Sequence, residues 1–139
     1  MITRIYTGDY VVIDYDLSVP CTMATYFDFM LPAEFKAHMN FALEIMQEKI
    51  RETGRMLWMP DVRLAPARDQ ETIHWIMEDW NLRAIKAGIR HIAMIVPEEL
   101  WVVMAIEDYS SKVQADGMTV KYFKDVASAK NWFIELPYA

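Results

Sequence analysis

The chain has 139 residues, a net charge of −6 and a hydrophobic share of 54%. These values predict one globular domain over residues 1–139 and exclude an intrinsically disordered chain. The acidic balance argues against a surface for nucleic acid or anionic membranes, because both select clustered Lys and Arg. The single cysteine, Cys21, cannot form an internal disulfide. We expect a soluble cytoplasmic protein with no signal peptide, integral membrane segment or cofactor.

The first thirty residues predict a β-hairpin. Residues 10–15 (YVVIDY) are β-branched and aromatic, and residues 23–29 form the second predicted strand after a connection that contains Pro20. A shorter strand around residues 4–6 is expected to precede them. The pair Gly8 and Asp9 would turn the chain between the first two strands.

A helix and a short strand come next. Pro32 suits the first helical position, because its missing N–H would have no partner there, and apolar residues at helical spacing continue to Gly54. Residues 56–58 then predict a short strand that ends at Pro60. Residues 62–68 predict a loop.

The clearest pattern lies in residues 69–96. Asp69 stands where an N-cap belongs and Gly88 where a helix-terminating glycine belongs. Between them, apolar residues recur at spacings of three and four: Ile73, Ile76, Met77, Trp80, Ala84 and Ala87. Residues 92–96 are apolar at consecutive positions, which is typical of a strand buried on both faces. A helix packed on a buried strand is therefore expected at the centre of the molecule.

The C-terminal part predicts a further helix, a strand and a last helix. Pro97 would open the first of these, with Gly117 ending it, and residues 120–123 alternate as a half-buried strand. Asp125 would cap the last helix. Strands that alternate with helices after a hairpin predict an α/β fold: a small mixed β-sheet with an N-terminal hairpin followed by β-α units.

Three segments carry a family resemblance: residues 57–61 (LWMPD), 87–97 (AGIRHIAMIVP) and 120–125 (VKYFKD). In their order and spacing, they resemble the STAS domain (sulphate transporter and anti-sigma-factor antagonist) in its small stand-alone form, over a core of about residues 10–133. The resemblance implies a non-enzymatic module that binds other proteins or small ligands. The serine that family members phosphorylate at the start of the second helix is absent, and the nearest hydroxyl is Thr72.

The predicted loop and the helix after it are the first place to look for a functional surface. In open α/β sheets ligands bind at this edge, and a helix N-terminus attracts anions. Arg63 and Arg68 could clamp a phosphate or carboxylate. Alternatively, they could pair locally with Asp61, Asp69 and Glu71. Asp69 could imitate a fixed phosphate charge, although a plain N-cap is the simpler interpretation.

Aromatic and titratable residues nearby give weaker signals. Four tryptophans could line an apolar pocket or an interface, or could simply pack in the core: Trp58, Trp75, Trp80 and Trp101. His74 and Glu78 share a helix face and could hold a metal or move a proton. A zinc site needs three or four ligands, however, so a solvated helix face is the favoured interpretation.

Two functional hypotheses follow. The leading one is a non-catalytic STAS-like interaction module that binds a protein partner or itself through a surface with these residues: Trp58, Asp61, Arg63, Arg68, Asp69, Thr72, Trp75 and Trp101. The alternative is a small-ligand carrier or minor enzyme that binds an anionic, partly apolar molecule near residues 61–69. Neither hypothesis includes a metal or a nucleic acid.

Overall fold

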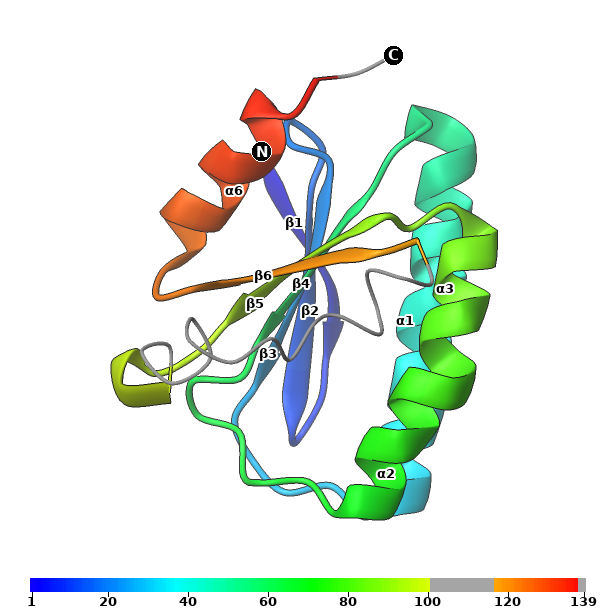
Figure 1. Cartoon of the computed structure of the whole chain (residues 1–139), viewed down its shortest axis with the longest axis vertical. Coiled ribbons are helices and arrows are strands. Elements are labelled where there is room, and N and C mark those ends of the chain that lie inside the picture. Colours follow the sequence, from blue (N-terminus) through cyan, green and yellow to red (C-terminus); the bar gives the residue numbers. More distant parts are fainter. Residues whose placement is uncertain (101–116, 138–139) are drawn as a thin grey trace.

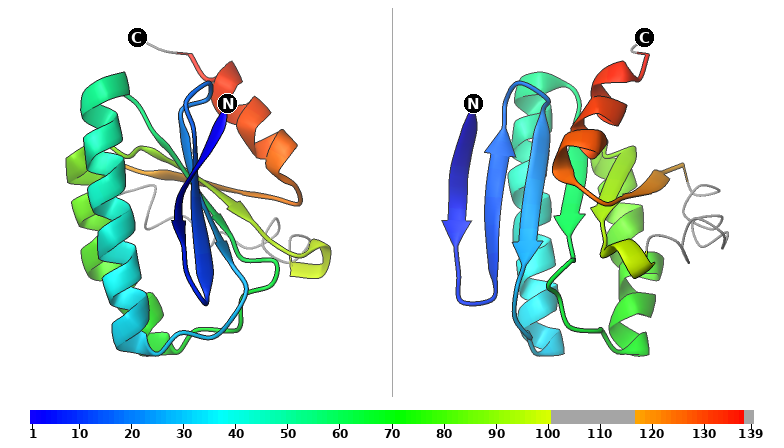
Figure 2. Two further views of the ribbon diagram at one scale, coloured as in Figure 1. Left: turned by 180° about the vertical axis from the view of Figure 1, so that it is seen from behind. Right: turned by 90° about the vertical axis from the view of Figure 1, so that its left-hand side faces the viewer.

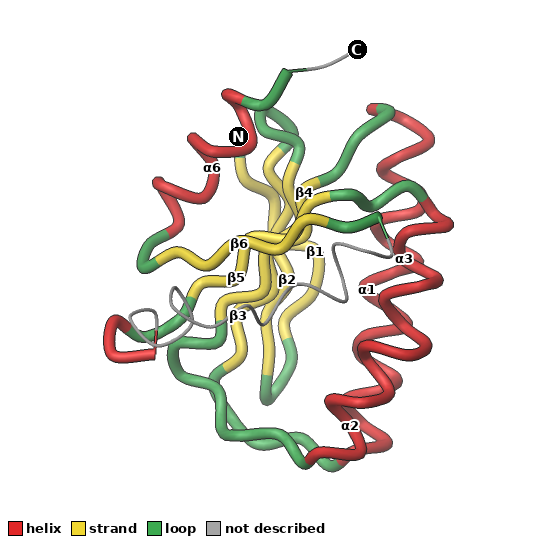
Figure 3. Tube along the Cα trace, in the orientation of Figure 1, coloured by secondary structure: helices red, strands yellow, loops and turns green. Residues whose placement is uncertain are grey.

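The computed structural model describes residues 1–100 and 117–137. A six-stranded sheet runs through the molecule, with helices on both of its faces (Figure 1). The strands are β1 (Ile2–Thr7), β2 (Val11–Asp16), β3 (Cys21–Tyr26), β4 (Leu57–Asp61), β5 (His91–Ile95) and β6 (Thr119–Phe123). The helices are α1 (Pro32–Thr53), α2 (Gln70–Trp75), the π-helical turn η1 (Ile76–Trp80), α3 (Asn81–Ala87) and α6 (Val126–Glu135). Figure 3 shows that α2, η1 and α3 form one continuous helix.

The strands follow one another across the sheet in chain order, as the right-hand view of Figure 2 shows. β1, β2 and β3 pair antiparallel, and β3, β4, β5 and β6 pair parallel. The predicted α/β fold, with a mixed sheet and an opening hairpin, is therefore confirmed. The predicted strand over residues 23–29 is placed too late in the sequence, because β3 covers Cys21–Tyr26.

The prediction that the fourth strand stops at Pro60 is wrong, since β4 continues to Asp61. Pro60 pairs with Ala24 of β3. On the other side, the pairs between β4 and β5 skip the positions around Pro60 and resume at Asp61, which pairs with Ile95. The missing N–H of a proline removes one ladder hydrogen bond. Here the pairing is interrupted only between β4 and β5. The unbroken pairing with β3 allows β4 to continue through Pro60.

Local capping sets the helix ends as the sequence indicates. The backbone N–H of Leu31 donates to the Glu34 carboxylate at 2.9 Å at the start of α1. Gly54 ends this helix with φ 80°, and Gly88 ends α3 with φ 110°. Only glycine takes such left-handed angles without steric cost, so both helices stop where a glycine follows.

The two faces of the sheet have separate cores. Side chains alternate along a strand, so neighbouring residues of β4 belong to different cores. Trp58 packs with α1 and with the α2–η1–α3 helix, whereas Leu57 packs with Phe133 of α6. β5 divides in the same way, with Ile92 on the first face and Ala93 on the second. The predicted strand with two buried faces is confirmed.

The C-terminal elements are described in part. Of the helix predicted after Pro97, residues 98–100 are helical and the remainder lies outside the described residues. β6 and α6 form as predicted, and the Asp125 side chain accepts the N–H of Ser128 at 2.8 Å as an N-cap. Within residues 1–100 and 117–137, no helix has the length and apolar character needed to cross a membrane.

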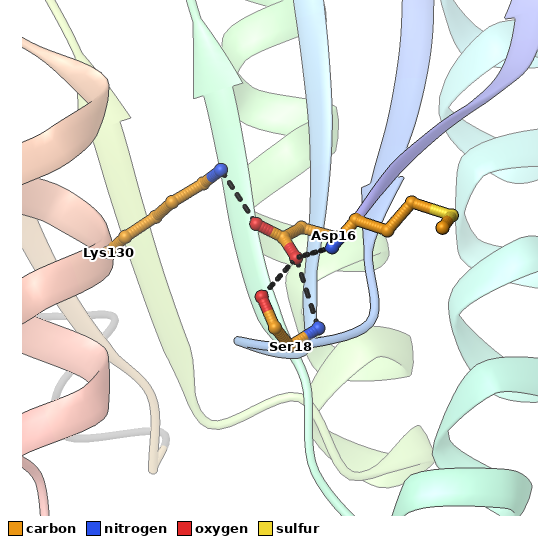
Figure 4. A network of polar contacts seen from close by, with 4 residues as sticks. Asp16, Ser18 and Lys130 are labelled. Atoms are coloured by element: carbon orange, nitrogen blue, oxygen red, sulfur yellow. Dashed lines mark hydrogen bonds and ion pairs between the residues drawn. The ribbon is translucent and has the colours of Figure 1, made fainter.

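A buried polar network ties α6 to the strands (Figure 4). Asp16 accepts hydrogen bonds from Lys130 Nζ at 2.8 Å and from the Ser18 hydroxyl at 2.6 Å, and the amino group of Met1 lies 3.8 Å away. Burial raises the pKa of Asp16, but the hydrogen bonds from Lys130 and Ser18 outweigh it and hold this pKa at about 2. Asp16 is therefore a carboxylate at neutral pH.

This network predicts the effect of removing the lysine. Lys130→Met leaves the carboxylate of Asp16 buried with one partner fewer, and breaking a buried ion pair in this way costs about 3 kcal/mol. We expect urea unfolding at pH 7 to show this loss, and the double variant Asp16→Asn/Lys130→Met to recover most of it. The control Lys86→Met replaces an exposed lysine. A free energy of unfolding for Lys130→Met equal to that of the control would contradict the prediction.

Candidate functional site

The helix-covered face of β4, β5 and β6 forms the floor of a cavity. Every second residue of these strands faces the same side, and pairing aligns Trp58 with Ile92 and Ile92 with Val120. The cavity has a volume of about 400 Å³, which lies in the range of ligand sites, roughly 300–1,000 Å³. The floor residues are Trp58, Pro60, Ile92, Met94, Val120 and Tyr122. We call this space the apolar cavity.

The α2–η1–α3 helix forms one wall of the apolar cavity. Its lining residues are Ile73, Ile76, Met77, Trp80 and Asn81. Residues of β3, of α1 and of the loop 65–68 also line the cavity, together with Val62 and Leu100. Among the described lining residues, Arg68 carries the only charge and Asn81 the only carboxamide. A cavity of this composition suits a largely apolar ligand with few polar contacts.

Trp80 fastens this wall to α1. Its indole N–H donates to the backbone carbonyl of Met39 at 2.9 Å, and its ring centre lies 5.9 Å from that of Trp58. The side chain is fully buried. A large ring with its one polar atom satisfied holds the helix at a fixed distance from the sheet.

Asp69 and Thr72 have a structural role at the start of the wall. The Asp69 carboxylate accepts the Thr72 N–H at 3.0 Å and the Thr72 hydroxyl at 2.6 Å. The hydrogen bonds from Thr72 hold the pKa of Asp69 below its usual range. The N-cap interpretation is confirmed. Thr72 is buried, with its hydroxyl already bonded.

The two predicted arginines have different surroundings. Arg63 donates two side-chain hydrogen bonds to Asp61, from Nε at 3.0 Å and from an Nη atom at 2.7 Å, and this hydrogen bonding to Asp61 raises the pKa of Arg63. Arg63 therefore takes the local pairing that the sequence left open. It does not belong to the described lining of the apolar cavity. The clamp of two arginines is not formed.

Arg68 is the arginine that faces the apolar cavity. Its guanidinium carbon lies 3.8 Å from the ring centre of Phe35 and 5.9 Å from that of Tyr26. Within the part of the chain that the structure describes, Arg68 makes no ion pair and no side-chain hydrogen bond. Burial lowers the pKa of Arg68, against the opposing effect of Tyr26 and Asp69. Arginine stays protonated despite such shifts, so a half-buried cation lines the cavity.

The predicted tryptophans also differ in whether they line the apolar cavity. Trp58 lines the apolar cavity. Trp75 is half-buried against the first core, with the cations of Lys36 and Arg83 at 5.5 and 5.9 Å from its ring centre. Trp101 lies outside the described residues. The structure thus brings together Trp58 and Arg68 from the predicted set and leaves Trp75 apart from them.

The weak metal signal on the central helix gains no support. His74 and Glu78 are both exposed on the helix surface. Within residues 1–100 and 117–137, no group of three or more His, Cys, Asp or Glu side chains is placed to hold a metal ion.

Tyr26 and His38 form a buried pair beside Arg68 that the sequence did not indicate. The Tyr26 hydroxyl and His38 Nε2 share a hydrogen bond of 2.7 Å between β3 and α1. Burial, with the nearby charge of Arg68, lowers the pKa of His38 to about 4, and burial raises the pKa of Tyr26. Both side chains are therefore neutral at pH 7.

Asn81 is the second residue that sequence reasoning missed. It is buried and lines the apolar cavity, four positions after Met77. A polar residue on the apolar stripe of a helix is the signal that could have identified it.

The Tyr26–His38 pair predicts how stability depends on pH. Unfolded histidine takes up a proton near pH 6.5, whereas folded His38 does so only near pH 4. The unfolded state therefore binds more protons between these values, and stability falls as pH drops from about 6.5 to 4. Between pH 6.5 and 4, the free energy of unfolding of His38→Gln, measured with urea, should fall by up to about 3 kcal/mol less than that of the wild type. Burial also lowers the pKa of His91, but this residue contributes equally to the pH dependence of the wild type and of His38→Gln.

His74→Gln, a change at an exposed histidine, is the matched control and should keep the pH dependence of the wild type. Equal slopes for His38→Gln and the wild type between pH 4 and 6.5 would show that the prediction is wrong.

Comparisons with protein-family models, with curated proteins and with solved structures found no match to this chain. The resemblance to the STAS domain therefore stays a prediction. What the structure establishes is the α/β class, with a mixed sheet of six strands and an apolar cavity on its helix-covered face.

Proposed function

We propose that this chain binds a small amphipathic anion in the apolar cavity, with the alkyl part between the sheet and the α2–η1–α3 helix and the anionic end at Arg68. The observation that carries the proposal is the half-buried guanidinium of Arg68, which forms no direct ion pair among the described residues, although the charge of Asp69 acts on it from a distance. The proposal corresponds to the alternative hypothesis of the sequence analysis, a carrier of an anionic, partly apolar molecule. The site now includes Arg68 and Trp58 but not Arg63.

The charge of Arg68 supplies the first part of the argument. A cation withdrawn from water without a partner costs free energy, and an anionic ligand would recover that cost through charge-assisted hydrogen bonds. Stacking on Phe35 at 3.8 Å fixes the plane of the guanidinium and leaves its N–H edges for the ligand. Carboxylate and phosphate oxygens match this planar set of donors.

The lining supplies the second part. Ile73, Ile76 and Met77 are only half-buried although they face the apolar cavity. Covering apolar surface with a ligand contributes about 25 cal/mol per Å². An alkyl chain would therefore add affinity that an inorganic anion cannot obtain. The proposed role is non-enzymatic binding and carriage of such a molecule.

Substitution of Arg68 tests this site. We use decanoate as the anionic probe and decanol as its neutral counterpart, and measure binding by calorimetry and by the rise in unfolding midpoint. Arg68→Met keeps much of the apolar stem and removes the charge. We expect decanoate binding to weaken at least about tenfold, the value of one charge-assisted hydrogen bond, and decanol binding to change little.

Arg63→Met is the matched control, because it removes the same charge from the same loop outside the lining. It should bind decanoate like the wild type, although it unfolds more easily because it leaves Asp61 unpaired. If folded wild-type protein binds neither probe, or if both arginine variants bind decanoate equally well, the proposed function is wrong.

Exposed apolar residues favour a second candidate, the interaction module. Phe27, Phe29, Leu31 and Leu64 are between 41% and 71% exposed. They lie in the loops that follow β3 and β4, which are parallel neighbours, and Figure 1 shows these loops side by side at one end of the sheet. We call these four residues the loop patch. Exposed apolar side chains on neighbouring loops are typical of a surface that binds a protein partner or a second copy of the chain.

The loop patch predicts self-association. Phe29→Ser/Leu64→Ser removes two exposed side chains whose burial contributes about 1.5–3 kcal/mol each, so the dimer dissociation constant from sedimentation equilibrium should rise at least about tenfold. Leu17→Ser, at an exposed leucine outside the patch, should leave it unchanged. A wild-type protein that stays monomeric at every concentration would contradict self-association through the loop patch.

A further inference from the structure

The Asn81 side chain lacks a partner inside the apolar cavity. Asn81 is 6% exposed and lines the cavity. Its carboxamide has no hydrogen-bond partner within residues 1–100 or 117–137, yet its amide atoms are not among the fully enclosed polar atoms that lack a partner, so they reach the space of the cavity. Buried carboxamides in native proteins are almost always hydrogen-bonded, because leaving their donors and acceptor unpaired is unfavourable. Water or a polar group of a ligand is therefore expected to bond Asn81 within the cavity.

The helix is irregular at the same place. Ile76–Trp80 form a π-helical turn, in which the backbone N–H of Asn81 donates to the carbonyl of Ile76 rather than to that of Met77. Such turns are rare and occur frequently at functional sites. The backbone amide of Asn81 is thus satisfied, whereas its side chain has no partner within residues 1–100 or 117–137 and remains available to the cavity.

Arg68 and Asn81 contact different parts of the apolar cavity. Arg68 precedes the helix that begins at Gln70, and Asn81 follows its π turn. At the usual rise per residue, residues 70 and 81 lie about 16 Å apart along the axis. Ile73, Ile76 and Met77 line the wall between the two polar residues. A ligand that reaches both must have polar groups separated by an apolar segment.

We infer that the ligand of the apolar cavity carries a second polar group, an uncharged hydroxyl or keto oxygen on its alkyl chain, which hydrogen-bonds Asn81. This inference rests on the proposed function, the binding of an amphipathic anion at Arg68. A carboxamide offers both a donor and an acceptor, so it serves a hydroxyl or a carbonyl equally well. A second charge is disfavoured, because the neighbouring side chains are apolar and provide no counter-ion.

The test compares decanoate with its positional hydroxy and keto isomers. Binding of each to the wild type is measured by calorimetry, which scans the position of the second oxygen along the chain without presuming it. At the matching position we expect about tenfold tighter binding than decanoate, the value of one buried hydrogen bond. The other isomers should bind more weakly than decanoate, because they bury a hydroxyl without a partner.

Asn81→Leu replaces the carboxamide by an apolar group of similar shape. It should lose the preference for the matching isomer while binding decanoate at least as tightly as the wild type, and its ligand-free unfolding midpoint should rise. Asn81→Ala serves the same purpose if the leucine disturbs the fold. Asn131→Leu, at an exposed asparagine on α6, should keep the preference.

The outcomes separate the two proposals. If the wild type binds decanoate but prefers no isomer, as expected if water alone satisfies Asn81, the inference is overturned and the amphipathic anion stands. A preference that persists in both Asn81 variants also overturns the inference. If no alkyl anion binds, the proposed function fails, and the inference fails with it.

Discussion

Burial of β4 and β5 on both faces is the constraint on which the rest of the structure depends. Each residue of these strands must fit one of two cores, so Leu57 and Trp58 are neighbours in the chain yet pack against different helices. α6 closes one face. On the other face the hydrogen bond from Trp80 to α1 holds the central helix at a set distance, and the apolar cavity occupies the space that these side chains leave.

Charge placement is the reason why we propose one cation of this acidic chain as a ligand contact. Arg63 and Arg68 share a loop, but Arg63 is satisfied by Asp61 whereas Arg68 stacks on the ring of Phe35. Stacking orients a guanidinium without neutralising it. Because the lining around Arg68 is apolar, selectivity would come from the combination of charge and hydrocarbon and would exclude small inorganic anions. His38 is neutral at pH 7, so it does not add a second positive charge beside Arg68.

The sequence allowed prediction of features that depend on nearby residues. Asp69 and Gly88 act within one helical turn, so spacing and residue type predict their caps. Pro60 led to a wrong prediction of where β4 ends. Which neighbouring strand loses a hydrogen bond to a proline depends on the arrangement of the sheet, which the local sequence does not give. Arg63 and Arg68 could not be told apart without the conformation of their loop. The contact of Tyr26 with His38 joins two elements, whereas Asn81 was visible as a polar residue on an apolar stripe.

The pairing of Asp16 with Lys130 joins residues 114 positions apart in the chain. Synthesis proceeds from the N-terminus, so β1, β2 and β3 can pair while α6 has not yet been made. During that interval the carboxylate of Asp16 stays without its lysine, and the second core lacks Phe133. The face of the sheet that α6 covers therefore cannot be closed before residues 130–133 have been synthesised.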